Sequence, residues 1–111
     1  MPVTQLTLKE PPEEDASVAE KQDYTFNPIQ AAKELKIGGF YFRKHSYKAA
    51  ARRFEEATKW DPNNTEAWLR LGEAQEKLGD MKAARAAWGK VIEIEPDSKQ
   101  SAELRKKLSK N

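Results

Sequence analysis

Few side chains in this chain of 111 residues could take part in covalent or metal chemistry. The sequence has no cysteine and a single histidine, His45. This composition excludes a disulfide framework, a thiolate metal site, a cysteine nucleophile and a zinc site with several histidines. Neither a glycine-rich phosphate loop nor a G-x-S-x-G nucleophile elbow occurs. We therefore expect no catalytic residue, no metal and no cofactor, and interpret His45 as a surface residue of a loop.

A cluster of basic residues is the other group that could bind a ligand. Its members lie in one short stretch: Arg43, Lys44, Lys48, Arg52 and Arg53. Nucleic-acid binding would need such cations on one face, with exposed aromatic side chains between them. Three acidic residues between positions 55 and 61 dilute the cluster. A solvated face is therefore the preferred interpretation, and weak RNA binding stays open as an alternative.

The first 26 residues differ in composition from the rest of the chain. Residues 1–27 hold two lysines and six acidic residues, whereas the whole chain has a net charge of +2, so the remainder is basic. Three prolines interrupt any helix in this segment, and its composition cannot bury enough apolar surface to offset chain entropy. We predict a flexible acidic N-terminal arm over residues 1–26 that rests at most weakly on the basic cluster.

The sequence shows no membrane span and no export signal. The mean hydropathy is −0.92, and no apolar run approaches the roughly 20 residues that a membrane span needs. A signal peptide would need a basic start followed by an apolar core. The expected location is cytoplasmic by default, and an exported or periplasmic location stays open if a signal has been removed.

The rest of the chain repeats itself with an offset of 34 residues. The segment Trp60-Asp61-Pro62 recurs as Ile94-Glu95-Pro96, and Lys48-Ala49-Ala50 recurs as Lys82-Ala83-Ala84. The same offset pairs residues of similar size: Gly38 with Gly72, Leu35 with Leu69, Phe54 with Trp88 and Tyr47 with Met81. Matched pairs over a whole window of this length indicate a tandem repeat.

Within each unit the apolar spacing is helical. Ala67, Leu71, Ala74 and Leu78 advance by four, three and four residues, which places them on one helix face. Helix starts are predicted at residues that favour the N-cap: Asn27, Ser46, Asp80, and Asp97 or Ser98. We therefore predict two helical hairpins, repeat one over residues 31–64 and repeat two over residues 65–98, followed by a capping helix over residues 98–110.

These residues resemble the tetratricopeptide repeat. Repeat two carries the family's pattern at Trp68, Leu71, Gly72, Ala84, Trp88 and Pro96. Repeat one carries it at Gly38, Tyr41, Ala50, Phe54, Ala57 and Pro62, and departs from it at Glu34 and His45. The resemblance implies an all-α superhelix (solenoid) over residues 27–111, made of the two hairpins and the capping helix. We expect Gly38 and Gly72 to be small because the neighbouring helix crosses close to their backbone.

In this family the first helix of each unit lines a concave groove that binds part of another protein. By position, the resemblance gives these groove candidates: Leu35, Lys36, Gly39, Phe42, Arg43, Leu69, Arg70, Glu73, Glu76 and Lys77. An apolar floor with basic flanks suits an extended or helical peptide with acidic residues. Members that grip a C-terminal carboxylate have lysine and asparagine where this chain has Leu35 and Gly39, which argues against such a clamp.

We therefore predict a non-catalytic protein–protein interaction module whose partner is another protein or peptide, acidic in character. Two repeats are few for a solenoid, so we also expect marginal stability or burial of an exposed repeat edge against another chain, self-association included. A structural role in a bacterial cell-envelope assembly stays open beside RNA binding, because residues 27–62 are somewhat similar to envelope lipoproteins built from such repeats.

Overall fold

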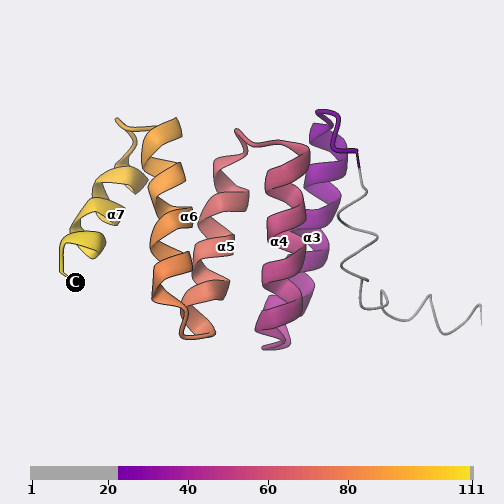
Figure 1. Ribbon diagram of the computed structural model, residues 1–111, viewed down its shortest axis with the longest axis horizontal. Coiled ribbons are helices and arrows are strands. Elements are labelled where there is room, and N and C mark those ends of the chain that lie inside the picture. The colour runs from indigo at the N-terminus through magenta and orange to yellow at the C-terminus, as the bar shows by residue number, and fades with distance from the viewer. Residues whose placement is uncertain (1–22, 111) are drawn as a thin grey trace, which may run out of the picture.

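The computed structural model describes residues 23–110, which form five helices and no strand (Figure 1). The helices are α3 (Pro28–Arg43), α4 (Tyr47–Trp60), α5 (Thr65–Lys77), α6 (Met81–Ile94) and α7 (Lys99–Ser109). This confirms the predicted all-α repeat fold. The predicted arm lies outside the described residues apart from residues 23–26.

Polar side chains begin four of the five helices. The side-chain oxygens of Asn27, Asn64, Asp80 and Ser98 each accept a hydrogen bond from the backbone N–H three residues further on. Such N-caps satisfy one of the N–H groups that the first helical turn leaves without a partner. Ser46 is the N-cap residue of α4, as predicted, although its side chain makes no capping hydrogen bond.

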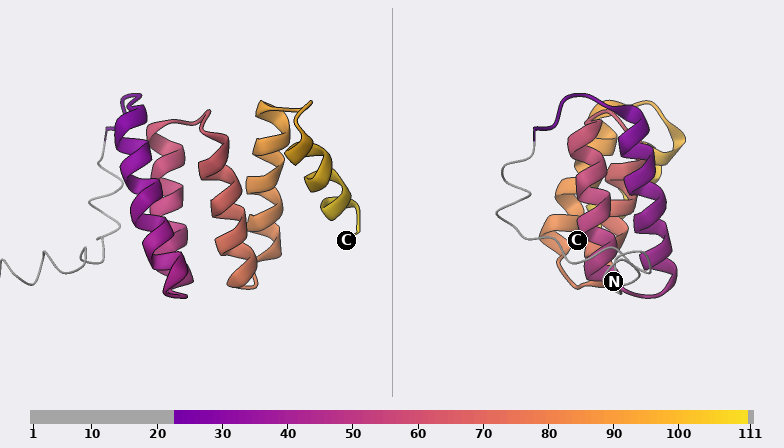
Figure 2. Two further views of the ribbon diagram at one scale, coloured as in Figure 1. Left: turned by 180° about the vertical axis from the view of Figure 1, so that it is seen from behind. Right: turned by 90° about the vertical axis from the view of Figure 1, so that its right-hand side faces the viewer.

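The helices alternate in direction and form two layers, as the three views show (Figures 1 and 2). Each helix packs against the next one along the chain. In addition α3 approaches α5 directly, whereas α4 and α6 make no such close backbone contact among the described residues. The stack is therefore closer on the side of α3 and α5, the side that the family resemblance gives as its inner face, and we call this side the concave face.

The space beside the two repeat glycines is filled by different groups from those we expected. A Cβ on Gly38 would lie 2.5 Å from Cε1 of Phe54, and a Cβ on Gly72 would meet the indole Nε1 of Trp88 and lie 2.5 Å from its Cδ1. The nearest neighbours are thus aromatic side chains of the second helix of each hairpin, not its backbone. Since both rings are fully buried, each glycine makes room for the largest fully buried side chain of its repeat.

The two ends of the stack are unlike each other. At the C-terminal end α7 covers α6, with Leu104 buried and the hydroxyl of Ser101 donating to the carbonyl of Glu95 at 2.6 Å. At the N-terminal end Phe26 and Ile29 are 65% and 72% exposed. The predicted self-association through a repeat edge would use this apolar end, and it stays a prediction.

Candidate functional site

The concave face is built from α3 and α5, and the predicted groove residues differ in how they lie on it. Lys36, Arg43 and Lys77 are exposed. The other polar candidates, Arg70, Glu73 and Glu76, are half-buried. Of the remaining four, Gly39 is buried, while Leu35, Phe42 and Leu69 are half-buried and pack against the core.

Leu35 and Leu69 are the two apolar residues predicted to form the floor of the groove. Both are half-buried: Leu35 packs against the core of the first hairpin, and Leu69 packs against the cluster that contains Trp88 and Leu104. Gly39 is buried, and a Cβ there would lie 3.5 Å from Nη1 of Arg43. Part of the surface of Leu35 and of Leu69 is therefore used in core packing, which leaves less of it to contact a ligand.

Arg70 connects the two repeats across this face. Its Cζ lies 5.2 Å from the ring centroid of Phe42 on α3 and 5.0 Å from that of Phe54 on α4. Its Nε also forms an ion pair with Glu73 at 3.2 Å. A guanidinium over an aromatic ring is attracted by the negative face of the ring. The contact with Arg70 therefore restrains the ring of Phe42. This ring also packs edge-on against Tyr47, with the two ring centroids 5.2 Å apart.

The capping helix adds a residue that sequence analysis missed. Lys107 Nζ lies 3.3 Å from a carboxylate oxygen of Glu76 and 4.5 Å from the ring centroid of Trp88. Lys107 follows Glu73 by the same 34-residue offset that relates the two repeats. This offset was the sequence signal from which Lys107 could have been found. Lys107 extends the concave face from α5 onto α7.

The acidic side chains of the concave face have ion-pair partners, whereas several of its basic side chains have none among the described residues. Glu73 is paired with Arg70, and Glu76 is paired with Lys107. Among residues 23–110, Lys36, Arg43 and Lys77 form no ion pair, although Lys77 lies 5.9 Å from the ring centroid of Tyr47. The face therefore presents exposed cations, while its own carboxylates, Glu73 and Glu76, are each paired with a cation.

The basic cluster proposed from the sequence does not form one face. Arg53 turns inward and pairs with Glu34 at 2.9 Å, with side chains only 13% and 9% exposed. Arg43, Lys44 and Lys48 are instead exposed around the turn between α3 and α4. His45 lies in the same turn, as predicted, and its ring stacks on Tyr47 with centroids 5.6 Å apart.

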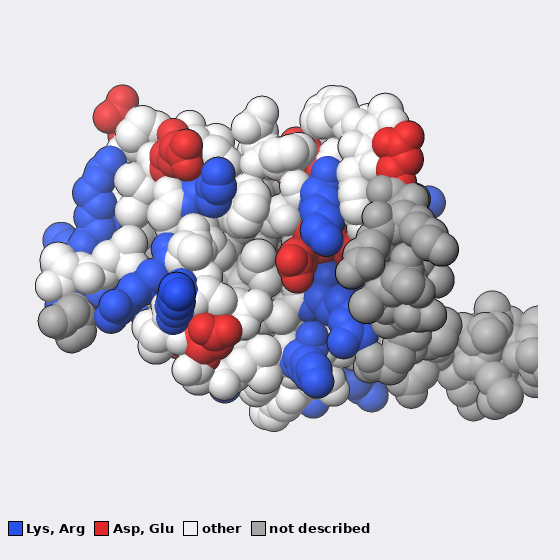
Figure 3. All heavy atoms as spheres, viewed as in Figure 1, with Lys and Arg blue, Asp and Glu red and all other residues white. Residues whose placement is uncertain are grey.

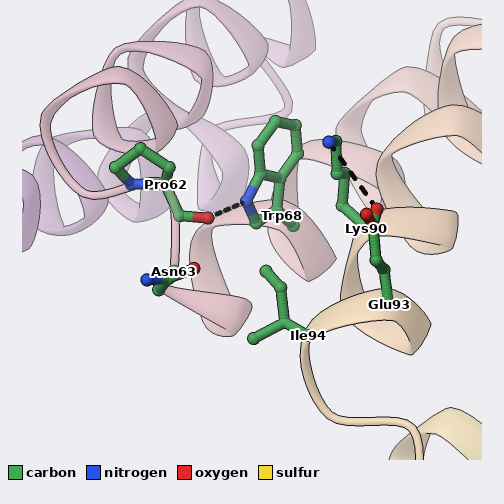
Figure 4. A pocket seen from close by; sticks show the side chains of 6 residues that line it. All are labelled: Pro62, Asn63, Trp68, Lys90, Glu93 and Ile94. Carbon is green, nitrogen blue, oxygen red and sulfur yellow. Dashed lines mark hydrogen bonds and ion pairs between the residues drawn. The ribbon is translucent and has the colours of Figure 1, made fainter.

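A second hollow lies away from these residues, beside Trp68. It has a volume of about 540 Å³ and is lined by the α4–α5 turn and by α5 and α6: Pro62, Asn63, Trp68, Lys90, Glu93 and Ile94 (Figure 4). The indole N–H of Trp68 donates to the carbonyl of Pro62 at 2.7 Å, and Lys90 pairs with Glu93 at 3.6 Å. With its main polar groups paired to one another, this hollow presents no distinct ligand chemistry.

Neither a metal site nor a membrane span emerges from the described part of the chain. Residues 23–110 contain no group of three or more histidine, cysteine, aspartate or glutamate side chains arranged to hold a metal ion. None of their helices combines the length and the apolar character needed to cross a bilayer.

A family model described as tetratricopeptide repeat matches residues 41–108. The chain belongs to the tetratricopeptide repeat family. Its curated relatives include Hsp70-Hsp90 organizing protein 3 of Arabidopsis thaliana, 31% identical over 77 residues that cover 69% of this chain and 14% of the relative. Peptidyl-prolyl cis-trans isomerase FKBP4 of Homo sapiens is 25% identical over 87 residues, covering 78% of this chain and 19% of that protein. The chain thus spans less than a fifth of the length of either relative.

One similar solved structure is that of the first TPR of Spaghetti (RPAP3) bound to the HSP90 peptide SRMEEVD. It shares 21% identity with this chain, covers 73% of it and 92% of the solved chain, and superposes with a TM-score of 0.35. At that score, positions in its groove cannot be transferred to this chain.

These findings confirm the predicted family, and with it a protein–peptide interaction module. Tetratricopeptide repeats are typically non-catalytic modules of this kind. The groove residues named above remain predictions, because the comparisons identify the family and not the contact residues of this member.

Proposed function

We propose that the concave face of α3, α5 and α7 binds an acidic segment of another protein and carries out no catalysis. The observation that carries this proposal is the charge state of the face. Its two carboxylates, Glu73 and Glu76, are already paired, while Lys36, Arg43 and Lys77 are exposed without an acidic partner among the described residues. Carboxylates of a partner would supply the missing counter-charges.

The apolar part of the contact would come from half-buried side chains rather than from an open floor. Phe42 and Leu69 each present some surface on this face while the rest of the side chain packs inward. Interfaces of this type gain affinity from a few apolar anchors, and surrounding charges add specificity and a faster association rate. We therefore expect a partner segment with acidic residues on either side of an apolar one.

We further propose that the partner is not gripped by its chain-terminal carboxylate. Relatives named for Hsp70 and Hsp90 organisation are similar to this chain, but Leu35 and Gly39 offer no lysine or asparagine at the positions that a clamp of this kind requires. An internal acidic segment would satisfy the exposed cations equally well.

Charge reversal at the three exposed cations tests this function. The variant Lys36→Glu/Arg43→Glu/Lys77→Glu is compared with Lys33→Glu/Lys59→Glu/Lys90→Glu, a matched control with the same change in net charge at exposed lysines elsewhere. Both serve as bait in the native host, and a fluorescent acidic peptide such as SRMEEVD is titrated by anisotropy. We expect the first variant to lose its captured proteins and to weaken peptide binding at least tenfold.

Equal capture and equal peptide affinity for the two variants would rule out the concave face as the binding surface. The same peptide with an amidated C-terminus should bind within about twofold of the free acid, since one terminal charge on an exposed surface contributes little. A much larger loss on amidation would show that a carboxylate clamp exists in spite of Leu35 and Gly39.

A further inference from the structure

The lower end of the molecule in Figure 1 carries an unusual concentration of positive charge. It contains the α3–α4 turn and the α5–α6 turn, and α7 runs towards the same side. Five exposed cations lie in or beside the two turns: Arg43, Lys44, Lys48, Lys77 and Lys82. We call this surface the turn end. Two carboxylates lie beside these cations: that of Asp80 caps α6, and that of Glu76 is paired with Lys107.

The opposite end of the helices carries more acidic residues than the turn end, although Lys59 and Lys99 also lie there. Asp61, Glu66, Glu95 and Asp97 lie at the α4–α5 and α6–α7 connections. Figure 3 shows most acidic side chains of this view in the upper half and a concentration of basic ones in the lower half. The molecule is therefore electrically polarised along its helix axes, and its positive pole is the turn end.

Helix stabilisation does not explain two of these cations. Lys48 and Lys82 lie in the first turns of α4 and α6, and neither first turn contains an acidic residue. The positive end of the helix dipole disfavours a cation there. The two lysines occupy equivalent positions of the two repeats, so the same unfavourable placement occurs twice. A local rule broken in this way points to a function rather than to folding.

Aliphatic side chains are exposed between these charges. Leu78 is 46% exposed and Met81 is 38% exposed, on either side of the tip of the α5–α6 turn. They lie next to Lys77 and Lys82 in the sequence. Apolar residues flanked by cations are the composition that enters the headgroup region of an anionic bilayer.

The aromatic rings at this end are less suited to stacking on nucleic-acid bases. His45 stacks on Tyr47 with an interplanar angle of 24°, and the ammonium group of Lys44 lies 5.2 Å from the ring centroid of Phe40. Base stacking needs free ring faces between the cations. Phe40 is 41% exposed but Lys44 lies over its ring, and the other two exposed apolar residues, Leu78 and Met81, have no ring to stack on a base, which favours lipid over RNA.

We propose that the turn end binds the surface of an anionic lipid membrane, with Leu78 and Met81 among the headgroups and the lysines beside the lipid phosphates and carboxylates. This goes beyond the proposed peptide binding and uses the end of the helices, which shares only Arg43 and Lys77 with the proposed peptide contacts. The helices would stand upright on the bilayer, and the concave face along their sides would stay open to a partner.

Co-sedimentation with lipid vesicles tests the proposal. The full chain is mixed with vesicles of phosphatidylserine and phosphatidylcholine in equal parts, and with vesicles of phosphatidylcholine alone. The test variant is Lys44→Gln/Lys48→Gln/Lys82→Gln, and the matched control is Lys59→Gln/Lys90→Gln/Lys99→Gln at exposed lysines outside the turn end. All six lysines lie outside the proposed peptide contacts, so failure of one proposal is distinguishable from failure of the other.

We expect binding to the phosphatidylserine vesicles that weakens as salt rises, and little binding to phosphatidylcholine alone. Each lysine near an anionic surface contributes about fivefold to the partition coefficient, so the test variant should lose about a hundredfold and the control less than threefold. The variant Leu78→Gln/Met81→Gln should bind the vesicles less than the unchanged chain does, and most clearly at high salt, where the apolar contribution dominates.

Equal losses for the two lysine variants would overturn the proposal, and so would absence of binding to phosphatidylserine vesicles at low salt. A labelled single-stranded RNA is titrated in parallel. RNA binding that is lost in the test variant, with no vesicle binding by the unchanged chain, would replace the lipid by RNA as the ligand of the turn end.

Discussion

Replacing Gly72 by alanine tests the packing on which the repeat depends. A Cβ at this position would meet the indole of Trp88 at Nε1 and lie 2.5 Å from Cδ1 and 2.8 Å from Cε2. Trp88 is only 1% exposed, so its ring has no free space to move into. Either the ring leaves its preferred rotamer or α5 shifts away from α6.

Two opposing effects set the size of the change. Alanine favours a helix interior over glycine by about 1 kcal/mol, which by itself would stabilise the fold. Overpacking a buried site typically costs about 1–3 kcal/mol, and contact with three atoms of a rigid ring places Gly72→Ala at the upper end. We therefore expect a net loss of about 2 kcal/mol.

Gly89→Ala is the matched control. Gly89 lies inside α6, and a Cβ there would meet no atom within 4 Å. This variant keeps the gain in helix propensity without the steric cost, so it should raise the free energy of unfolding by about 1 kcal/mol. The difference between the two variants then isolates the contact with Trp88, at about 3 kcal/mol.

Urea unfolding followed by circular dichroism at a helical wavelength gives both values. The same variants should differ in melting temperature by more than 10 °C, since about 1 kcal/mol corresponds to roughly 4–8 °C in a domain of this size. Trp88→Phe should recover part of the loss in Gly72→Ala, because the smaller ring leaves room for the methyl group and the Nε1–H that it removes has no hydrogen-bond partner. Similar stabilisation by Gly72→Ala and Gly89→Ala would refute the packing argument.

Two further substitutions examine the places where repeat one departs from the family pattern. His45 has a φ of 64°, a left-handed backbone conformation that strains every residue with a Cβ. His45→Gly should therefore be about 1 kcal/mol more stable than His45→Ala in urea unfolding, since both lose the ring and only alanine retains the strain. Equal stabilities would show that the turn is unstrained. Glu34→Ala removes the carboxylate that pairs with the half-buried guanidinium of Arg53 and should cost about 1–3 kcal/mol, the usual range for a lost hydrogen bond to a charged group. Glu34→Met/Arg53→Met should recover most of that loss in thermal unfolding, and additive losses in the double variant would contradict this.

The elements of the fold were predictable because short-range signals determine them. Asn27 followed by proline, Asp80 after glycine and Ser98 after the second repeat each begin a helix as predicted. The 34-residue offset also paired Gly38 with Gly72 and Phe54 with Trp88, although the sequence could not show that each ring fills the space above the glycine of its own hairpin.

The groove was less predictable, because its character depends on contacts between residues far apart in the chain. Arg70 was predicted as a free basic flank, but it lies over Phe42 and is paired with Glu73. Lys107 was not predicted at all, and its contact with Glu76 joins residues 31 positions apart. Position in a repeat indicates which face a residue occupies, but not which neighbour takes up its charge.

The same reasoning explains why the irregular positions of repeat one do not disturb the fold. Glu34 takes the place of the family's aromatic residue, and its buried carboxylate is matched by Arg53 and by the side-chain amide of Gln30 at 3.0 Å. His45 takes the place of a glycine and keeps the left-handed turn while its ring packs on Tyr47. In both cases the backbone follows the repeat pattern, and a side chain specific to this chain compensates for the departure. Such compensation is cheaper than a new backbone path, because it reorganises one or two side chains where a new path would break helix hydrogen bonds.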